Sequence, residues 1–96
     1  MIARELDPIF KAKSVAVIGA SNDPAKWGYS IMERLIKGGY KGSIFPINPK
    51  EPAILGVTAY SNIREVPHRV DLAIFAIPGP LVPGAMKEAI LSGVRG

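Results

Sequence analysis

SVAVIG, residues 14–19, is a continuous run of β-branched and small apolar residues that ends on a glycine. A strand covered by helices on both faces has this composition, because both of its alternating sets of side chains are buried. The same character recurs in DLAIFAI, residues 71–77, and in GSIFPI, residues 42–47. The three segments predict buried parallel strands.

Two segments with helical periodicity separate and follow these strands. The first covers residues 28–37 and ends at the pair Gly38-Gly39, which can adopt the left-handed conformation that closes a helix. The second covers residues 81–91. Its expected apolar stripe consists of Val82, Met86, Ala89 and Ile90.

The middle of the chain carries weaker signals. A short extended piece is expected around residues 56–58, and a helix of one or two turns over residues 62–66, capped by Ser61 and ended by Pro67. Buried strands that alternate with amphipathic helices indicate βαβ units. The fold class expected is therefore α/β, a Rossmann-like doubly wound parallel sheet, of which these 96 residues form the truncated first half.

Composition excludes several classes of protein. With 48% hydrophobic and 21% charged residues the chain is globular rather than disordered. The absence of cysteine excludes disulfides, thiolate metal sites and cysteine catalysis. The longest uncharged stretch, residues 72–86, is interrupted by three prolines and is too short to span a bilayer. We expect a cytoplasmic protein without a membrane segment.

The net charge of +4 does not indicate a nucleic-acid partner, since the basic residues are spread along the chain rather than gathered in a stripe with aromatic residues. In open α/β sheets ligands bind beyond the carboxyl ends of the strands. Three predicted loops lie there, at residues 19–28, 47–50 and 77–80. We expect the binding site where these loops meet.

The first loop begins with Gly19-Ala20 and ends at Gly28, so it lacks the second glycine of the dinucleotide fingerprint and the Gly-Lys-Ser/Thr of a P-loop. It still offers an anion site, because Ser21 and Asn22 can donate hydrogen bonds. Lys26 adds a cation at the start of a helix. A helix cap or turn is the alternative role for Ser21 and Asn22.

The second loop, Asn48-Pro49-Lys50, has a cation where an NAD-binding protein has an acid for the ribose. This favours a ligand with an additional phosphate, either NADP or coenzyme A, although Asn-Pro is also a common turn. The third loop contains Ile77-Pro78-Gly79, an apolar and stiff segment that suits an adenine ring or a pantetheine arm. A simple strand terminator is the alternative.

Residues for catalysis are not apparent. The sequence contains no carboxylate pair, metal-ligand cluster or Ser/His/Asp grouping, so no catalytic or metal-binding residue is expected. Its one histidine, His68, precedes the last strand at the end of the sheet opposite to the three loops. We expect it to be a surface turn residue.

Three motifs in order, VAVIGAS with KWG, then INPK, then DLAIFAIP, closely resemble the N-terminal CoA-binding domain of NDP-forming acyl-CoA synthetases. This family includes the ADP-forming acetate–CoA ligase α subunit, the succinyl-CoA synthetase α subunit and related protein acetyltransferases. The resemblance implies that the loop from Ser21 to Gly28 contacts the phosphate and ribose region of CoA. Lys50, offset by about one residue from the succinate enzyme's pattern, would pair with a CoA phosphate. Ile77, Pro78 and Gly79 would lie near the adenine and pantetheine.

The resemblance also implies a division of labour. A phosphohistidine domain and an ATP-grasp domain or subunit, which use ATP or ADP and Mg, would form the acyl phosphate that CoA attacks, and neither is present in these residues. We therefore expect residues 1–96 to be the CoA-binding N-terminal fragment of an ADP-forming acyl-CoA synthetase, inactive in isolation. A stand-alone CoA-binding regulatory module and an NADP-binding oxidoreductase domain stay open as alternative functions. A homo-oligomer stays open as the state of assembly.

Overall fold

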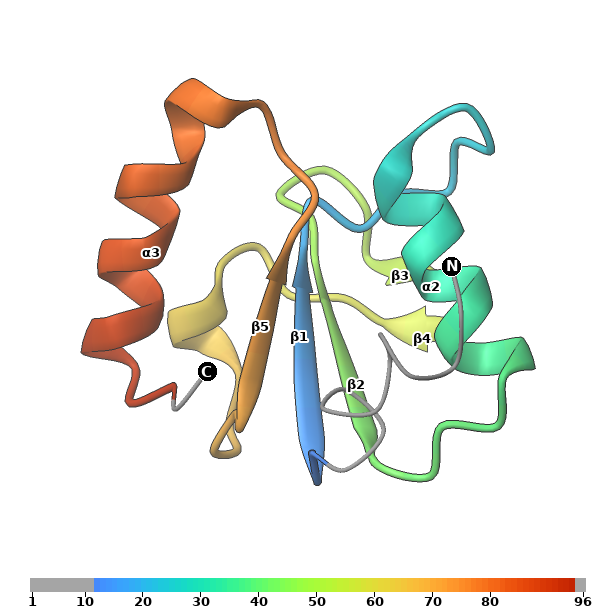
Figure 1. Ribbon diagram of the computed structural model, residues 1–96, viewed down its shortest axis with the longest axis horizontal. Helices are drawn as coiled ribbons and strands as arrows, with labels where there is room; N and C mark the ends of the chain where they lie inside the picture. The colour runs from blue at the N-terminus through green and yellow to red at the C-terminus, as the bar shows by residue number, and fades with distance from the viewer. Residues whose placement is uncertain (1–11, 95–96) are drawn as a thin grey trace.

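The computed structural model describes residues 12–94, and strand β1, Ser14–Ile18, lies at its centre (Figure 1). Strand β2, Ser43–Ile47, pairs with one side of β1, and strand β5, Leu72–Phe75, with the other, both in parallel. The register places Ile18 beside both Ile47 and Phe75, so the three strands end at the same edge. The expected α/β fold with a parallel sheet is confirmed.

The alternating side chains of β1 divide the core into two clusters, one on each face of the sheet. Val15 and Val17 pack on one face with Met32 and Leu35 of helix α2, Trp27–Lys37. On the opposite face lies a second cluster, which consists of Ala16, Ile18, Phe45, Ile47, Ile63, Val70 and Ala89. All five residues of β1 are buried, as a strand between two layers requires.

Helix α3, Val82–Leu91, covers the second face, but not with the stripe that the sequence predicted. Ala89 is buried at 4% exposure, and Ala85 packs beside it, whereas Met86 is 46% and Ile90 69% exposed. The expectation for Met86 and Ile90 was wrong. Small side chains form the contact because they let the helix axis approach the sheet closely, and the larger apolar residues are turned outward.

The segment between β2 and β5 contains a small hairpin and a short 3-10 helix. Strands β3, Ala53–Ile54, and β4, Val57–Thr58, pair antiparallel through a tight turn at Leu55-Gly56, where both residues have positive φ. Helix η1, Ile63–Glu65, is a single turn. Its cap is Asn62, whose side chain accepts a hydrogen bond from the Arg64 amide, and not Ser61 as the sequence predicted.

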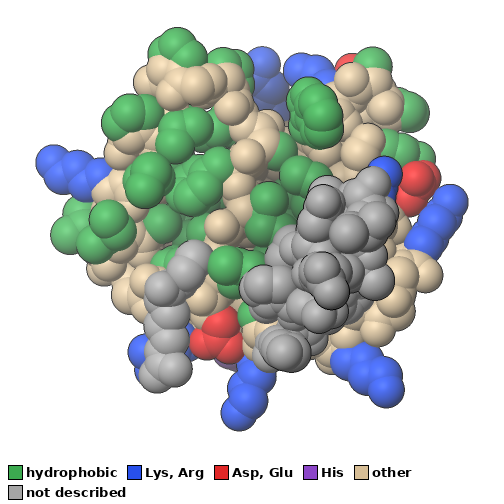
Figure 2. All heavy atoms as spheres, viewed as in Figure 1, with side chains coloured by type: hydrophobic (Ala, Val, Ile, Leu, Met, Phe, Trp, Pro, Cys, Tyr) green, Lys and Arg blue, Asp and Glu red, His purple; other side chains and the backbone are tan. Residues whose placement is uncertain are grey.

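Apolar side chains gather on the face formed by α3 and β5 (Figure 2). The large exposed apolar residues of this region are Leu81, Met86, Ile90 and Leu91. Within residues 12–94, β5 pairs with β1 alone, so its other edge is open. In the same range there is no helix with the length and apolar character needed to cross a membrane.

Candidate functional site

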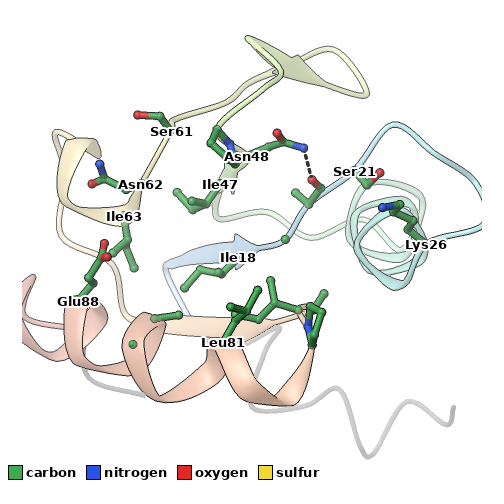
Figure 3. A pocket seen from close by; sticks show the side chains of 18 residues that line it. Ile18, Ser21, Lys26, Ile47, Asn48, Ser61, Asn62, Ile63, Leu81 and Glu88 are labelled. Carbon is green, nitrogen blue, oxygen red and sulfur yellow. Dashed lines mark hydrogen bonds between the residues drawn. The ribbon is translucent and has the colours of Figure 1, made fainter.

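A cavity of about 600 Å³ lies over the carboxyl ends of β1, β2 and β5 (Figure 3). Ile18, Ile47 and Ile77 supply an apolar floor, and the loops that follow the three strands supply walls. The structure brings together most of the residues that the sequence predicted for the site. Those that line the cavity are Gly19, Ala20, Ser21, Lys26, Asn48, Pro49, Ile77 and Pro78.

Two glycines, one after β1 and one at the start of α2, allow the first loop to pack closely against neighbouring backbone. Gly19 has a φ of +91°, and a side chain there would come within 2.7 Å of the Ile77 methyl group. Gly28 lies against the carbonyl of Gly19 and the backbone of Ala20. Any larger residue at either position would push the loop away from the sheet, so both glycines shape the site by allowing contact between backbones.

The loop from Ser21 to Lys26 is folded by its own polar groups. The Asp23 amide donates to the Ser21 hydroxyl at 2.9 Å, and the Ala25 amide donates to the Asp23 carboxylate at 3.0 Å. Lys26 then occupies the N-cap position of α2, where no side chain caps the helix and no acidic residue lies in the first turn. The helix therefore presents uncompensated N–H groups and a lysine ammonium beside the cavity.

Asn48 joins the second loop to the first. Its Nδ2 donates to the Ala20 carbonyl at 2.9 Å, while its Oδ1 accepts from the amides of Lys50 and Glu51 at 2.7 and 3.2 Å. Both ends of the side chain are thus engaged by backbone groups. Asn48 fixes the shape of the wall, which agrees with the turn role that an Asn-Pro sequence favours.

Four of the predicted site residues do not line the cavity, namely Asn22, Gly28, Lys50 and Gly79. Asn22 holds the β3–β4 hairpin: it donates to the Ala53 carbonyl at 3.0 Å and accepts from the Leu55 amide at 2.9 Å. Lys50 is exposed, and Gly79 begins helix η2, Gly79–Leu81. His68 is exposed and precedes β5, whereas the third loop follows that strand, and the histidine ring stacks on Phe45.

The sequence reasoning missed the wall opposite α2. Ser61, Asn62 and Ile63 line it from the start of η1, Leu81 lines it from the end of η2, and α3 contributes Gly84, Ala85 and Glu88. The signal was the spacing: residues 84, 85 and 88 of α3 lie one, three and four positions apart and share one helix face, which Leu81 extends at its N-terminal end. The contribution of η1 depends on how the chain crosses from β2 to β5, which no local pattern reveals.

Residues 13–96 match the CoA binding domain family. The α subunit of acetate–CoA ligase [ADP-forming] I from Pyrococcus furiosus is 44% identical over 94 residues, which cover 94% of this chain and 20% of that subunit. The chain thus spans about a fifth of the length of this relative.

Two solved structures share the fold. Dinucleotide-forming acetyl-coenzyme A synthetase 1 from Ca. Korarchaeum cryptofilum, in complex with phosphate and ADP, has a TM-score of 0.86 at 36% identity, over 93% of this chain and 19% of that one. A conserved hypothetical protein from Pyrococcus furiosus has a TM-score of 0.76 at 34% identity, over 84% of this chain and 68% of that one. The same domain thus occurs in a long synthetase and in a short protein.

Proposed function

We propose, since the chain belongs to the CoA-binding domain family, that the cavity over β1, β2 and β5 binds coenzyme A. The observation that carries this proposal is the division of the cavity into a cationic end at Lys26 and a mostly apolar floor. CoA is divided in the same way. Its phosphates are anionic. Its adenine ring and pantetheine arm are neutral, and the ring face and the alkyl segments of the arm can pack against apolar side chains.

Lys26 is the residue best suited to hold a CoA phosphate. It is the one Lys or Arg that lines the cavity within the described part of the chain, and it stands at the uncapped start of α2. A helix N-terminus and an ammonium group together favour an anion more than either does alone. The hydroxyl of Ser21, buried at 9% exposure in the same wall, supplies a further polar contact.

The whole protein, in this proposal, is an ADP-forming acyl-CoA ligase that interconverts acyl-CoA, ADP and phosphate with the free acid, ATP and CoA. This domain holds CoA, and phosphohistidine and ATP-grasp domains or subunits supply the acyl phosphate and use ATP and Mg. Support comes from the relatives, which are named as ADP-forming acetate–CoA ligases and are several times longer than this chain. We accordingly place the protein in the cytoplasm, and the chain alone should bind CoA without turnover.

Calorimetric titration of the chain with CoA tests the proposal, with Lys26→Ala as the diagnostic variant. Removal of a charge-assisted contact to phosphate should weaken binding about tenfold or more. Lys41→Ala is the matched control, because Lys41 is exposed and does not line the cavity. Absence of CoA binding by the wild-type chain, or equal affinities for the two variants, would contradict the proposal.

A stand-alone CoA-binding module is the second candidate. The short Pyrococcus furiosus protein, of which this chain covers 68%, favours it. Both candidates require CoA binding, and an assay of the full natural polypeptide for ligase turnover separates them. NADP in the same titration tests the oxidoreductase alternative, which requires NADP to bind more tightly than CoA.

A further inference from the structure

The cavity has a second polar end, opposite Lys26. Figure 3 shows Ser61 and Asn62 at the start of η1 and Glu88 on α3, across the apolar floor from Ser21 and Lys26. Glu88 is the one acidic residue that lines the cavity in the described part of the chain. The cavity is therefore polarised, with a cation at one end and a carboxylate at the other.

The polar groups at this second end are not equally available to a ligand. The amide of Asn62 already accepts from the Arg64 amide at 2.9 Å and donates to the Glu65 carboxylate at 3.3 Å. The ion pair found within residues 12–94 joins Lys37 to Glu33, away from the cavity, so the carboxylate of Glu88 has no cationic partner there. Glu88 is therefore the carboxylate acceptor available at this end, beside the hydroxyl of Ser61.

The stability of α3 does not explain a carboxylate at position 88. Glu88 belongs to the last turn of the helix, where the backbone carbonyls carry partial negative charge, and no basic residue in that turn offsets it. A side chain that opposes its local electrostatics and faces a cavity is characteristic of a functional site.

We infer that Glu88 accepts a hydrogen bond from a neutral N–H group of the ligand that occupies the cavity. This inference rests on the proposed function, since CoA carries such donors in its adenine amino group and in the two amides of pantetheine. A phosphate would be repelled by Glu88 and attracted by Lys26. Glu88 thus fixes the direction in which the ligand lies, with its phosphates toward α2 and a neutral donor toward α3.

The sign of one substitution tests this role. CoA is highly anionic, so a bystander carboxylate only repels it, and Glu88→Ala would then leave the affinity unchanged or increase it. Loss of an accepted hydrogen bond should instead weaken CoA about tenfold. Glu33→Ala, which removes the same charge outside the cavity, should not weaken binding.

Two fragments of CoA identify the donor. Adenosine 3′,5′-bisphosphate carries the adenine amino group alone, and 4′-phosphopantetheine carries the amides alone. Glu88→Ala should weaken one of them and spare the other, whereas Lys26→Ala should weaken both, because both contain phosphate. Weakening of neither fragment, or of both equally, would overturn the role of Glu88.

The experiment separates failure of this inference from failure of the proposed function. A wild-type chain that binds CoA while Glu88→Ala binds it equally or better overturns the inference alone. A wild-type chain that binds neither CoA nor either fragment overturns the proposed function. Misfolding does not confuse the result, because Glu88 is exposed and alanine is a strong helix former, and a thermal denaturation curve checks this directly.

Discussion

Gly28, near the start of α2, packs directly against the carbonyl of Gly19, the residue that follows β1. This contact sets how close the helix lies to the sheet, and therefore where Lys26 stands relative to the cavity. Gly28→Ala should destabilise the fold by about 1–3 kcal/mol, because the new methyl group meets backbone atoms that cannot rotate away. Urea denaturation measures the change, and an unaltered midpoint would show that α2 can shift freely.

At Gly84, in α3, substitution by alanine should raise the stability of the fold rather than lower it. It faces the cavity, and a Cβ there has no neighbour within 4 Å. Gly84→Ala should therefore stabilise the protein by roughly 0.5–1 kcal/mol, the difference in helix propensity between the two residues. If the same urea series shows a loss of stability instead, the open space assigned to this face is wrong.

Asn22 links the first loop to the hairpin. Asn22→Ala removes both of its hydrogen bonds to the Ala53 carbonyl and the Leu55 amide. Because Asn22 is exposed, we expect a loss of only about 1 kcal/mol in global stability. Hydrogen exchange at the Leu55 amide should accelerate more than exchange in β1, and equal protection in the variant and the wild type would argue against the link.

The resemblance predicts that Lys50 pairs with a CoA phosphate, but Lys50 is exposed and does not line the cavity. A ligand that lacks one phosphate tests this prediction. Should Lys50 contact the 3′-phosphate of CoA, dephospho-CoA will bind the wild type about tenfold more weakly than CoA, and Lys50→Ala will abolish that difference. Lys41→Ala provides the comparison on another exposed lysine. A difference that survives in Lys50→Ala assigns the 3′-phosphate to other groups.

Tyr40 should make stability depend on alkaline pH. Burial raises the pKa of its hydroxyl above the ordinary value of 10.0, and the Asp71 carboxylate raises it further. The neutral hydroxyl, which donates to the Ala12 carbonyl at 2.7 Å, is thus favoured by folding. Its contribution is complete below pH 10.0 and is lost as the pH rises from there through the higher pKa of the folded state.

The comparison that checks this is the unfolding free energy of the wild type and of Tyr40→Phe across the alkaline range. The two proteins differ only in this hydroxyl, so the difference between the two curves reports Tyr40. That difference should shrink above pH 10.0, and a constant difference would assign the contribution of Tyr40 to packing alone.

The sequence predicted the parts of the fold that depend on local pattern. The SVAVI run identified the central strand to the residue, because burial on both faces demands an unbroken apolar segment. The position of the cavity agrees with the rule that parallel strands present ligands at their carboxyl ends. Ser21 and Lys26 of the first loop indeed line the cavity.

The roles of individual side chains at the cavity, and the face of α3 that packs on the sheet, depend on contacts between segments that are distant in the sequence. The amides of Asn22 and Asn48 could equally serve a ligand or the backbone, and only the folded loops show that both bind backbone groups. Nothing in the sequence around Glu88 reveals that η1 lies opposite it across the cavity. The side of α3 that meets the sheet depended on two alanines, which carry little hydrophobic signal of their own.

The hydrogen bonds between Asn22 and the hairpin also determine what chemical change at this residue would do to the stored protein. An asparagine side chain can hydrolyse spontaneously to aspartate, which would leave an acceptor facing the Ala53 carbonyl where a donor now stands. Of the two hydrogen bonds that join residue 22 to the hairpin, the one to the Ala53 carbonyl would be replaced by repulsion between two oxygens, while the overall fold persisted. Stored samples would then divide into two species one charge apart, with the hairpin loosened in the more acidic one.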